Sequence, residues 1–427
     1  MDSLVYILDT LQLAFGILVL YWWVWLPIIL FFVFWGNMVA FNRAQYLANL
    51  KWTLLEIRFP SEPHKSLKAM EQIFVSLHSV SPPPKTTRDK WNAFKARNFE
   101  GKVPNWYSFE IVGDSAEIHF YVRMIEDSRD LVEAQIYGHY PDAELTLAAD
   151  YTTGWPAALP NEEFEMSGVE LGLVKESIVP IKTYPEFEEE HAGKDDVRRI
   201  DPLAPVIQAI SMLSFAERVA IQMLIRPTGG DYIKKDQAAM DKLLEKPAKP
   251  ATSGVDSFFT SLEGTVGGIV GSAAVPVKEE KKEAKPFSQL TPGVQDLVKA
   301  IEHATSLLAF ETGIRILYVA RRDGYDKNRL GSVVASFKQF SSQNLNAFKP
   351  EFSPEVRKGR NKEAKTLDNK KMLDKRYRRR EFPRKPFVFN TEELTTVYHF
   401  PDAGVKTPAL PRVESKKGEP PAGLPTV

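Results

Sequence analysis

A run of 31 residues without a charged side chain, from Leu11 to Phe41, constrains this chain more than any other feature. About 20 apolar residues in a helix are enough to cross the hydrocarbon core of a bilayer. A secretory signal peptide begins with basic residues, but the first ten residues here carry Asp2 and Asp9 and no Lys or Arg. We therefore predict an uncleaved membrane anchor, rather than a signal peptide or the buried helix of a soluble core.

The residues around the run predict its orientation. Tryptophan is typical of both membrane interfaces, and Lys and Arg are typical of the cytoplasmic side. The first cations of the chain follow the run, so we expect a single pass of the cell (inner) membrane, with the N-terminus outside and the bulk of the chain in the cytoplasm. Pro27 leaves open a re-entrant hairpin, and residues 2–18 could instead lie along the surface. The residues expected at the interfaces are Trp22, Trp23, Trp25, Trp35 and Arg43.

The composition of the chain bounds its chemistry. Its 55 basic and 55 acidic side chains give a net charge of zero, so any attraction to polyanions must be local. A hydrophobic content of 44% is enough to bury real cores. Because the chain has no cysteine, disulfides, thiolate catalysis and cysteine metal sites are excluded.

Two stretches after the anchor (1–45) have the pattern of an α/β module. Residues 50–155 read as strand, helix, strand, strand, helix, strand, which is the ferredoxin-like, split βαβ order. In this module the stretch 106–124 forms a hairpin, and a Pro-rich loop precedes it. Residues 160–350 repeat much of this order of strands and helices. We therefore predict an α+β fold, with two ferredoxin-like α/β sandwich modules behind a transmembrane helix.

An insertion at 246–286 interrupts the second module. It is rich in Pro, Ala, Ser and Gly and ends in a charged stretch, which indicates a disordered linker. Its middle, VDSFFTSLEGTVGGIVGSAA, is apolar enough to touch a membrane surface or a partner, and this second interpretation stays open.

No motif in the chain predicts catalysis. There is no phosphate-binding P-loop, because the glycines around residue 268 are not followed by lysine. The seven histidines lack the spacing of a helical metal site. We therefore predict that the protein is not an enzyme and holds no cofactor or metal.

The strongest charged feature is a basic arm at 351–386. Within it, residues 357–385 carry fourteen Lys and Arg against four Asp and Glu. Such a segment suits the phosphates of nucleic acid or anionic lipid headgroups. The alternatives are a solvated arm and a surface that binds an acidic partner. The residues expected to make these contacts are Lys370, Lys371, Lys375, Arg376, Arg378, Arg379, Arg380, Arg384 and Lys385.

A capped helix and a Pro-rich connector are expected at 387–427. Asn390 is placed to cap a helix and Glu393 to complete a capping box, and Pro401 ends the helix. We predict that Leu394, Val397 and Phe400 form one side of this helix and dock a partner. The Pro-rich connector is stiff, and we expect it to lead to a further domain beyond Val427.

Several segments together resemble a known group of proteins. The segments are KWTLLEIRFP…KAMEQIF, LVEAQIYGHYPDAEL, IDPLAPVIQAI…VAIQMLIRP and FNTEELTTVYHFP…PRVESKKGEPPAGLP. They resemble the membrane-anchored, non-ATPase region of type IV secretion and conjugation-related proteins of uncultivated bacteria, a domain of unknown function. In longer relatives this region is similar to the lead-in to a HerA or FtsK-like ATPase.

The resemblance implies a function. It suggests a non-catalytic membrane scaffold of a type IV secretion-like or DNA-translocation apparatus, which positions a P-loop ATPase supplied in trans. DNA and further copies of the chain are additional expected partners. The alternative is a membrane-tethered nucleic-acid-binding protein that acts without a motor.

Overall fold

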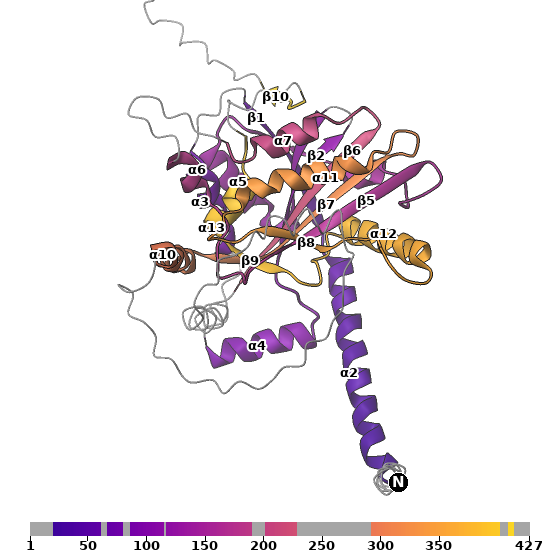
Figure 1. The fold of residues 1–427 in the computed structure, drawn as a ribbon. Helices are drawn as coiled ribbons and strands as arrows, with labels where there is room; N and C mark the ends of the chain where they lie inside the picture. The colour runs from indigo at the N-terminus through magenta and orange to yellow at the C-terminus, as the bar shows by residue number, and fades with distance from the viewer. Residues whose placement is uncertain are drawn as a thin grey trace, which may run out of the picture. The chain divides into compact units, whose positions relative to one another are not determined.

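The computed structural model describes residues 20–60, 66–79, 86–114, 117–189, 201–228, 292–401 and 409–413 (Figure 1). The chain divides into two compact units. The helical unit comprises residues 1–51 and 84–104, and the sheet unit comprises residues 52–83 and 105–427. The predicted linker at 246–286 and the connector after residue 413 lie outside the described residues.

The helical unit contains two helices, α2 (Trp22–Asn49) and α4 (Thr87–Asn98). α2 continues through Pro27 as one helix, so the alternative of a re-entrant hairpin at Pro27 does not hold for these residues. It is 28 residues and about 42 Å long, and none of its residues is buried. α4 lies where the sequence predicted only a Pro-rich loop. It begins at a capping box in which Thr86 and Asp89 satisfy each other's backbone N–H groups.

The sheet unit is built on one continuous sheet. Its strands follow the order β10-β1-β3-β2-β6-β7-β5-β8, with β4 also paired to β1 and β9 to β7. All of these pairs are antiparallel except that of β1 with β10. The strands are β1 (Trp52–Pro60), β2 (Tyr107–Asp114), β3 (Glu117–Ile125), β4 (Glu144–Leu147), β5 (Phe164–Leu173), β6 (Glu217–Pro227), β7 (Ala309–Arg321), β8 (Phe348–Phe352), β9 (Phe387–Asn390) and β10 (Arg412–Val413).

The sheet consists of two halves with the same strand order. The first four strands lie in the order β4-β1-β3-β2, and the next four lie in the order β8-β5-β7-β6. If the strands of each half are numbered in sequence order, both halves have the order fourth, first, third, second across the sheet. The halves join where β2 pairs with β6, from Tyr107 opposite Ile225 to Asp114 opposite Arg218. From the sequence we expected these halves to be separate domains, but backbone hydrogen bonds between β2 and β6 join them into one sheet.

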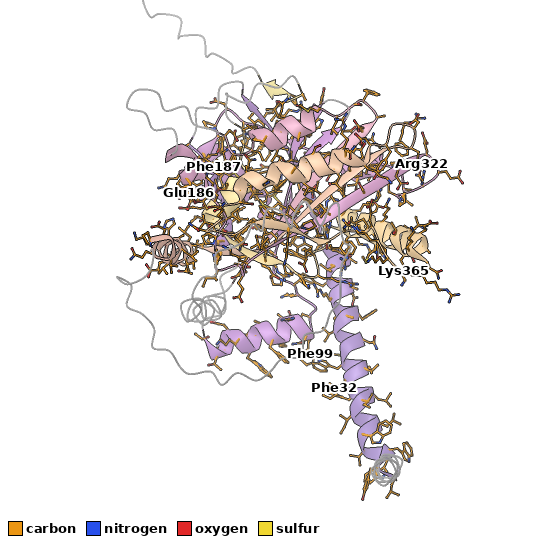
Figure 2. The ribbon with its side chains drawn as sticks, viewed as in Figure 1. Phe32, Phe99, Glu186, Phe187, Arg322 and Lys365 are labelled. Atoms are coloured by element: carbon orange, nitrogen blue, oxygen red, sulfur yellow. The ribbon has the colours of Figure 1, made fainter. Side chains whose placement is uncertain are left out.

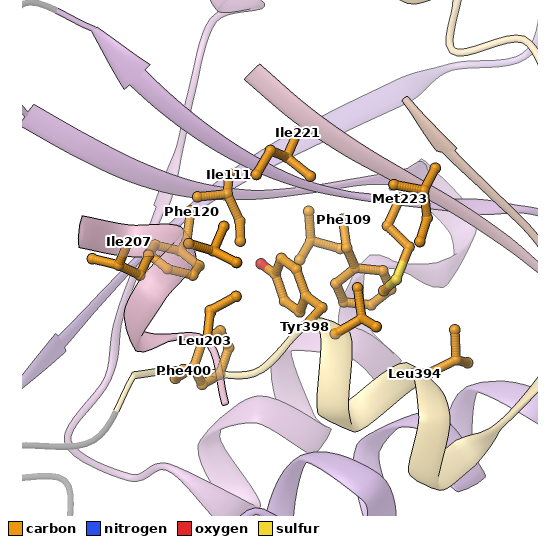
Figure 3. Packing of buried hydrophobic residues seen from close by; sticks show 14 of the residues in the cluster. Phe109, Ile111, Phe120, Leu203, Ile207, Ile221, Met223, Leu394, Tyr398 and Phe400 are labelled. Atoms are coloured by element: carbon orange, nitrogen blue, oxygen red, sulfur yellow. The ribbon is translucent and has the colours of Figure 1, made fainter. Parts of the chain in front are cut away.

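Alternation along the strands divides the core between the two faces of the sheet. Phe109 and Ile111 on β2 belong to the larger cluster, whereas Val112 belongs to the smaller one. Figure 3 shows the larger cluster, in which side chains from the strands meet Leu203, Ile207 and Leu394 from the helical layer. The helices that contribute to this cluster are α3 (Lys68–His78), α5 (Arg129–His139), α6 (Tyr184–Glu189), α7 (Ala204–Ser211), α11 (Lys327–Ser336) and α13 (Thr391–Val397).

The opposite face carries a thinner layer. Its cluster contains Trp155 and Leu159 from a loop and Leu373 and Tyr377 from α12 (Lys362–Arg379). A further helix, α10 (Pro292–Ser306), precedes β7 and forms a small cluster with residues 178–179. α12 therefore covers a sheet face, although the sequence predicted an arm at this position.

Candidate polyanion-binding surface

α12 is the helix formed by most of the predicted basic arm. Leu373 and Tyr377, one turn apart, are both fully buried. The ring of Tyr377 stacks on Trp155, with the planes 3° apart and the centroids 5.7 Å apart. The helix ends at Arg380, whose backbone adopts the left-handed conformation with φ of 51°. These contacts hold one side of α12 against the sheet and leave the other side in solvent.

The Arg380 side chain lies entirely inside the protein. Its exposed fraction is 0%, and its Nε donates to Glu110 Oε1 at 3.0 Å. Its Nη2 donates to Asp150 Oδ1 at 3.0 Å. Tyr151 Oη also donates to Glu110, at 2.5 Å, and contacts Tyr377 Oη. Arg380 is therefore a structural cation, and the prediction that it contacts a phosphate is wrong.

A second buried cation lies beside this group. Arg315 on β7 is 1% exposed and donates from Nη2 to Glu170 Oε1 at 2.6 Å. Its Nη1 donates to Gln222 Oε1 at 2.9 Å, and Gln222 in turn donates to Glu110 at 3.1 Å. Strands from both halves of the sheet thus share one hydrogen-bonded polar layer beneath α12.

Three more cations of the predicted site are engaged within the protein. Arg378 forms an ion pair with Asp374 at 2.8 Å and donates to the backbone carbonyls of Thr152 and Pro156. Lys370 pairs with Glu165 at 2.9 Å. Arg376 lies 3.6 Å from Glu170. Each of these three cations therefore already has a carboxylate partner, and Glu165 and Glu170 also pair with Arg322 and Arg315.

The electrostatics of the layer follow from burial and pairing. Burial raises the pKa of Glu110, but the Arg380 guanidinium, together with hydrogen bonds from Ser108 and Tyr151, outweighs burial and holds the pKa below its ordinary value. The pKa of Asp150 is lowered in the same way, with burial again opposing Arg380. Burial lowers the pKa of Arg315, and Glu170 only partly offsets it. Burial also raises the pKa of Asp374, although Arg378 opposes the change.

The outer side of α12 carries the remaining charge. Lys371, Lys375 and Arg379 are exposed and are spaced four residues apart, so they form a stripe about 12 Å long on one side of the helix. Arg379 has one weak partner, Glu381 at 3.5 Å. Lys365, nearer the start of α12, extends away from the ribbon in Figure 2. Among its exposed side chains, α12 has five cations and two carboxylates, Glu363 and Asp368.

Arg384 and Lys385 follow α12 and line a cavity of about 160 Å³ against β5 and β8. Glu170 and Glu351 also line it. Lys385 pairs with Glu351 at 2.6 Å, and Arg376, on the same wall, pairs with Glu170. Because Lys385 and Arg376 already have carboxylate partners, and Glu170 and Glu351 themselves line the cavity, it is not a ready anion site. Arg384 is exposed to solvent. The parts of the predicted surface that stay open are the outer stripe and Arg384.

The predicted interface residues lie along α2. Trp22 and Trp23 are 55% and 62% exposed at its start, and Arg43 is exposed near its end. From Trp22 to Arg43 the helix rises about 32 Å, close to the thickness of a hydrocarbon core. Trp25 and Trp35 are half-buried, and the Trp35 ring contacts Phe99 at 5.3 Å. α2 is long and apolar enough to cross a membrane.

The predicted docking residues are not available to a partner. The capping box of Asn390 and Glu393 is confirmed, and helix α13 follows it. However, Leu394, Val397 and Phe400 are 0%, 4% and 5% exposed and belong to the main core. The prediction of an exposed docking helix was therefore wrong. An amphipathic pattern does not say whether the apolar side faces a partner or the chain's own sheet.

The sequence analysis missed the carboxylates that bind the basic segment. Glu110 on β2 and Glu170 on β5 each lie between two apolar residues and are 0% and 3% exposed. A charged side chain is rarely buried unless it is paired, so each of them signals a buried cation elsewhere in the chain. That signal was present in the sequence, but nothing in it identified the partner. Among the described residues no group of three or more His, Asp or Glu side chains is arranged to hold a metal ion.

Comparison with known sequences identifies the family. The family described as Domain of unknown function (DUF8128) matches residues 44–412. The chain belongs to the DUF8128 family. The match begins directly after the apolar run and ends in β10, so the DUF8128 region includes α4 and the whole described sheet. No curated protein matches the chain.

Proposed function

We propose that this DUF8128 protein is a non-catalytic, membrane-anchored scaffold with its sheet unit in the cytoplasm. The observation that carries the proposal is α2, an apolar helix of which no residue is buried. A core helix of a soluble protein would have a buried side, whereas an apolar helix without a buried residue is suited to lipid. The cations that follow the apolar run favour the cytoplasmic side for its C-terminal end.

We further propose that each half of the sheet is a ferredoxin-like module. The shared order of fourth, first, third and second strand supports this, together with a helix after the first strand and another after the third. In this view, pairing of the two second strands fuses the modules into one wide platform. A rigid platform fixed to a membrane is suited to holding a partner in place.

The partner is proposed to be a P-loop ATPase supplied in trans, in a type IV secretion-like or DNA-translocation apparatus. This part of the proposal depends on the resemblance of the sequence segments. Because α13 is buried, we assign partner contact to the solvent side of the sheet unit. Among the described helices of the sheet unit, α12 has the most basic exposed surface, which is the outer stripe.

The membrane anchor is tested with introduced cysteines, which report unambiguously because the chain has none of its own. We expect the full chain to resist carbonate extraction. A cysteine in place of the exposed Lys358 should react with a membrane-impermeant maleimide only after the cells are opened. Labelling in intact cells would reverse the orientation, and recovery in the carbonate-soluble fraction would overturn the anchor.

The second candidate function is nucleic-acid binding without a motor, and the outer stripe favours it. Each neutralised phosphate of duplex DNA steepens the salt dependence of binding by about 0.9 log unit. Replacing Lys371, Lys375 and Arg379 by serine should therefore reduce the salt slope by up to about 2.7. The matched control replaces three exposed lysines elsewhere in the sheet unit, Lys68, Lys299 and Lys327. Equal slopes for the two triple variants would count against nucleic-acid binding by α12.

A further inference from the structure

α4, in the helical unit, presents two exposed aromatic side chains. Trp91 is 65% exposed and Phe94 is 46% exposed, and their rings stack at 5.7 Å. No residue of the helix is buried. Since α4 is a capped helix that leaves two stacked aromatic rings open, these rings favour a partner that is not water.

Cations lie on both sides of the aromatic pair. With 3.6 residues per turn, Trp91 and Phe94 lie about 60° apart around the helix. Arg88 and Lys95 flank them on one side, and Lys90 and Arg97 flank them on the other. All four cations are exposed. The single acidic residue of the helix, Asp89, accepts a hydrogen bond from the Thr86 backbone in the capping box. A strip of aromatic side chains between two rows of cations is complementary to an anionic lipid surface.

The segment that follows α4 is fixed against α2. Asn42 Nδ2 donates to the Phe99 carbonyl at 3.0 Å, and the Phe99 ring contacts Trp35. Gly101 has φ of +68°, and a Cβ there would lie 2.3 Å from the Asn42 carbonyl group, so the two backbones touch. Figure 2 shows Phe99 between α4 and α2. The two Asn42 contacts lie where the apolar run gives way to Asn42 and Arg43, at the end of α2 that would emerge from the membrane, and Trp35 lies about two turns earlier in the helix.

We propose that α4 is an interfacial helix. Trp91 and Phe94 enter the boundary between headgroups and acyl chains, in the leaflet where the C-terminal end of α2 emerges. The four flanking cations bind the anionic headgroups of that leaflet. The inference rests on the proposed membrane anchor, and it adds a second, lipid-selective attachment beside the transmembrane helix.

The test compares two labelling positions on α4 in the full chain. Thr87 lies on the aromatic side, between Trp91 and Phe94 in projection, whereas Ala93 lies on the opposite side. Each is changed separately to cysteine and labelled with an environment-sensitive fluorophore, which leaves both aromatics and all four cations in place. The protein is then placed in nanodiscs of phosphatidylcholine with or without phosphatidylglycerol.

We expect the label at 87 to be quenched by an aqueous quencher at least about threefold less than the label at 93, because the interface excludes water. A nitroxide near the lipid headgroups should quench the label at 87 more strongly than the label at 93. Changing both Trp91 and Phe94 to serine should remove the difference. The control Phe215→Ser, at a side chain 82% exposed on the sheet unit, should leave it unchanged.

The charge requirement is tested by changing Arg88, Lys90, Lys95 and Arg97 to glutamine. Protection at position 87 should then no longer increase with phosphatidylglycerol. A control with four exposed cations of the sheet unit neutralised (Lys68, Lys299, Arg321 and Lys327) should keep the lipid dependence.

Two results would overturn the inference while leaving the anchor standing. One is equal aqueous quenching at 87 and 93 in a chain that resists carbonate extraction. The other is protection at 87 that appears only after cell extract is added, which would mean that a protein covers α4. If the chain itself is extracted by carbonate, the anchor and the inference both fail.

Discussion

α12 and α13 follow each other closely in sequence but differ in how much of each helix is buried. α12 covers one face of the sheet with one side and keeps a row of cations in solvent. α13 lies in the opposite layer, and all seven of its residues are buried. Both had been predicted to lie outside the folded core, one as a basic arm and the other as a docking helix.

The difference teaches that net charge and amphipathicity do not by themselves locate a binding surface. The cations at the C-terminal half of α12 differ in whether a carboxylate lies within reach. Arg376, Arg378 and Arg380 turn toward carboxylates, whereas Lys371 and Lys375 turn toward water. In α13 no outward side remains. The predictions below test this contrast through the free energy of unfolding of the full chain in detergent.

The largest expected effect is at the buried end of α12. Arg380→Met leaves Glu110 buried without its cation, and removal of one partner of a buried ion pair costs about 3–5 kcal/mol of stability. Arg379→Met, one residue earlier on the exposed side, should change stability by less than about 0.5 kcal/mol. Chemical denaturation of the two variants provides the comparison. Similar losses for both would mean that the two sides of α12 are not distinct.

The next effect concerns the buried state of α13. Leu394→Ala should cost about 3 kcal/mol, because a large-to-small change in a packed core loses burial and leaves a cavity. The matched control is Leu367→Ala on α12, where the side chain is 40% exposed. We expect the control to lose less than about 1 kcal/mol. A stable Leu394→Ala protein that had lost only partner binding would restore the docking-helix interpretation.

A smaller effect is expected from pH. Burial raises the pKa of Glu393 to about 8, although its hydrogen bonds from the backbone N–H groups of Asn390 and Ile181 oppose the change. The folded state therefore keeps a proton that the unfolded chain releases above its ordinary carboxyl pKa, so stability falls as the pH rises from about 4.5 to about 8.

Between about pH 6 and about pH 7.5, this group should remove about 2 kcal/mol of stability. The check is the difference between wild type and Glu393→Gln, measured across that range. Glu363→Gln, at the exposed start of α12, should follow wild type at each pH. A difference that grows in the opposite direction would show that the helix N-terminus and backbone donors outweigh burial.

The smallest effect on stability is expected on the outer side of α12. The combined change of Lys371, Lys375 and Arg379 to serine should alter the free energy of unfolding by less than about 1 kcal/mol, because exposed charges contribute little. Thermal unfolding of the variant at low and high salt provides the measurement. A loss of several kcal/mol would show that these cations, like Arg380, support the fold and are not free to bind.

Local patterns in the sequence determined the elements that depend on near neighbours. β1 and α3 are the strand and helix with which the first module was expected to begin, and Asn390 and Glu393 form the predicted capping box. The length of the apolar run likewise identified the helix that can cross a membrane. Each of these depends on residues within a few turns or strand positions of one another, which a sequence displays directly.

Only the tertiary structure decided which charged or apolar helix sides stay exposed to solvent. Arg380 meets Glu110 across 270 residues of sequence, and Thr391 on α13 lies against Glu71 across 320. α4 was missed for a different reason, since its two aromatics among many charges give no broad apolar side and the prolines before it suggested a loop. Burial of a charge or of a helix depends on which distant carboxylate or sheet face comes to lie against it. Chain topology sets that arrangement, and local sequence periodicity contains no record of it.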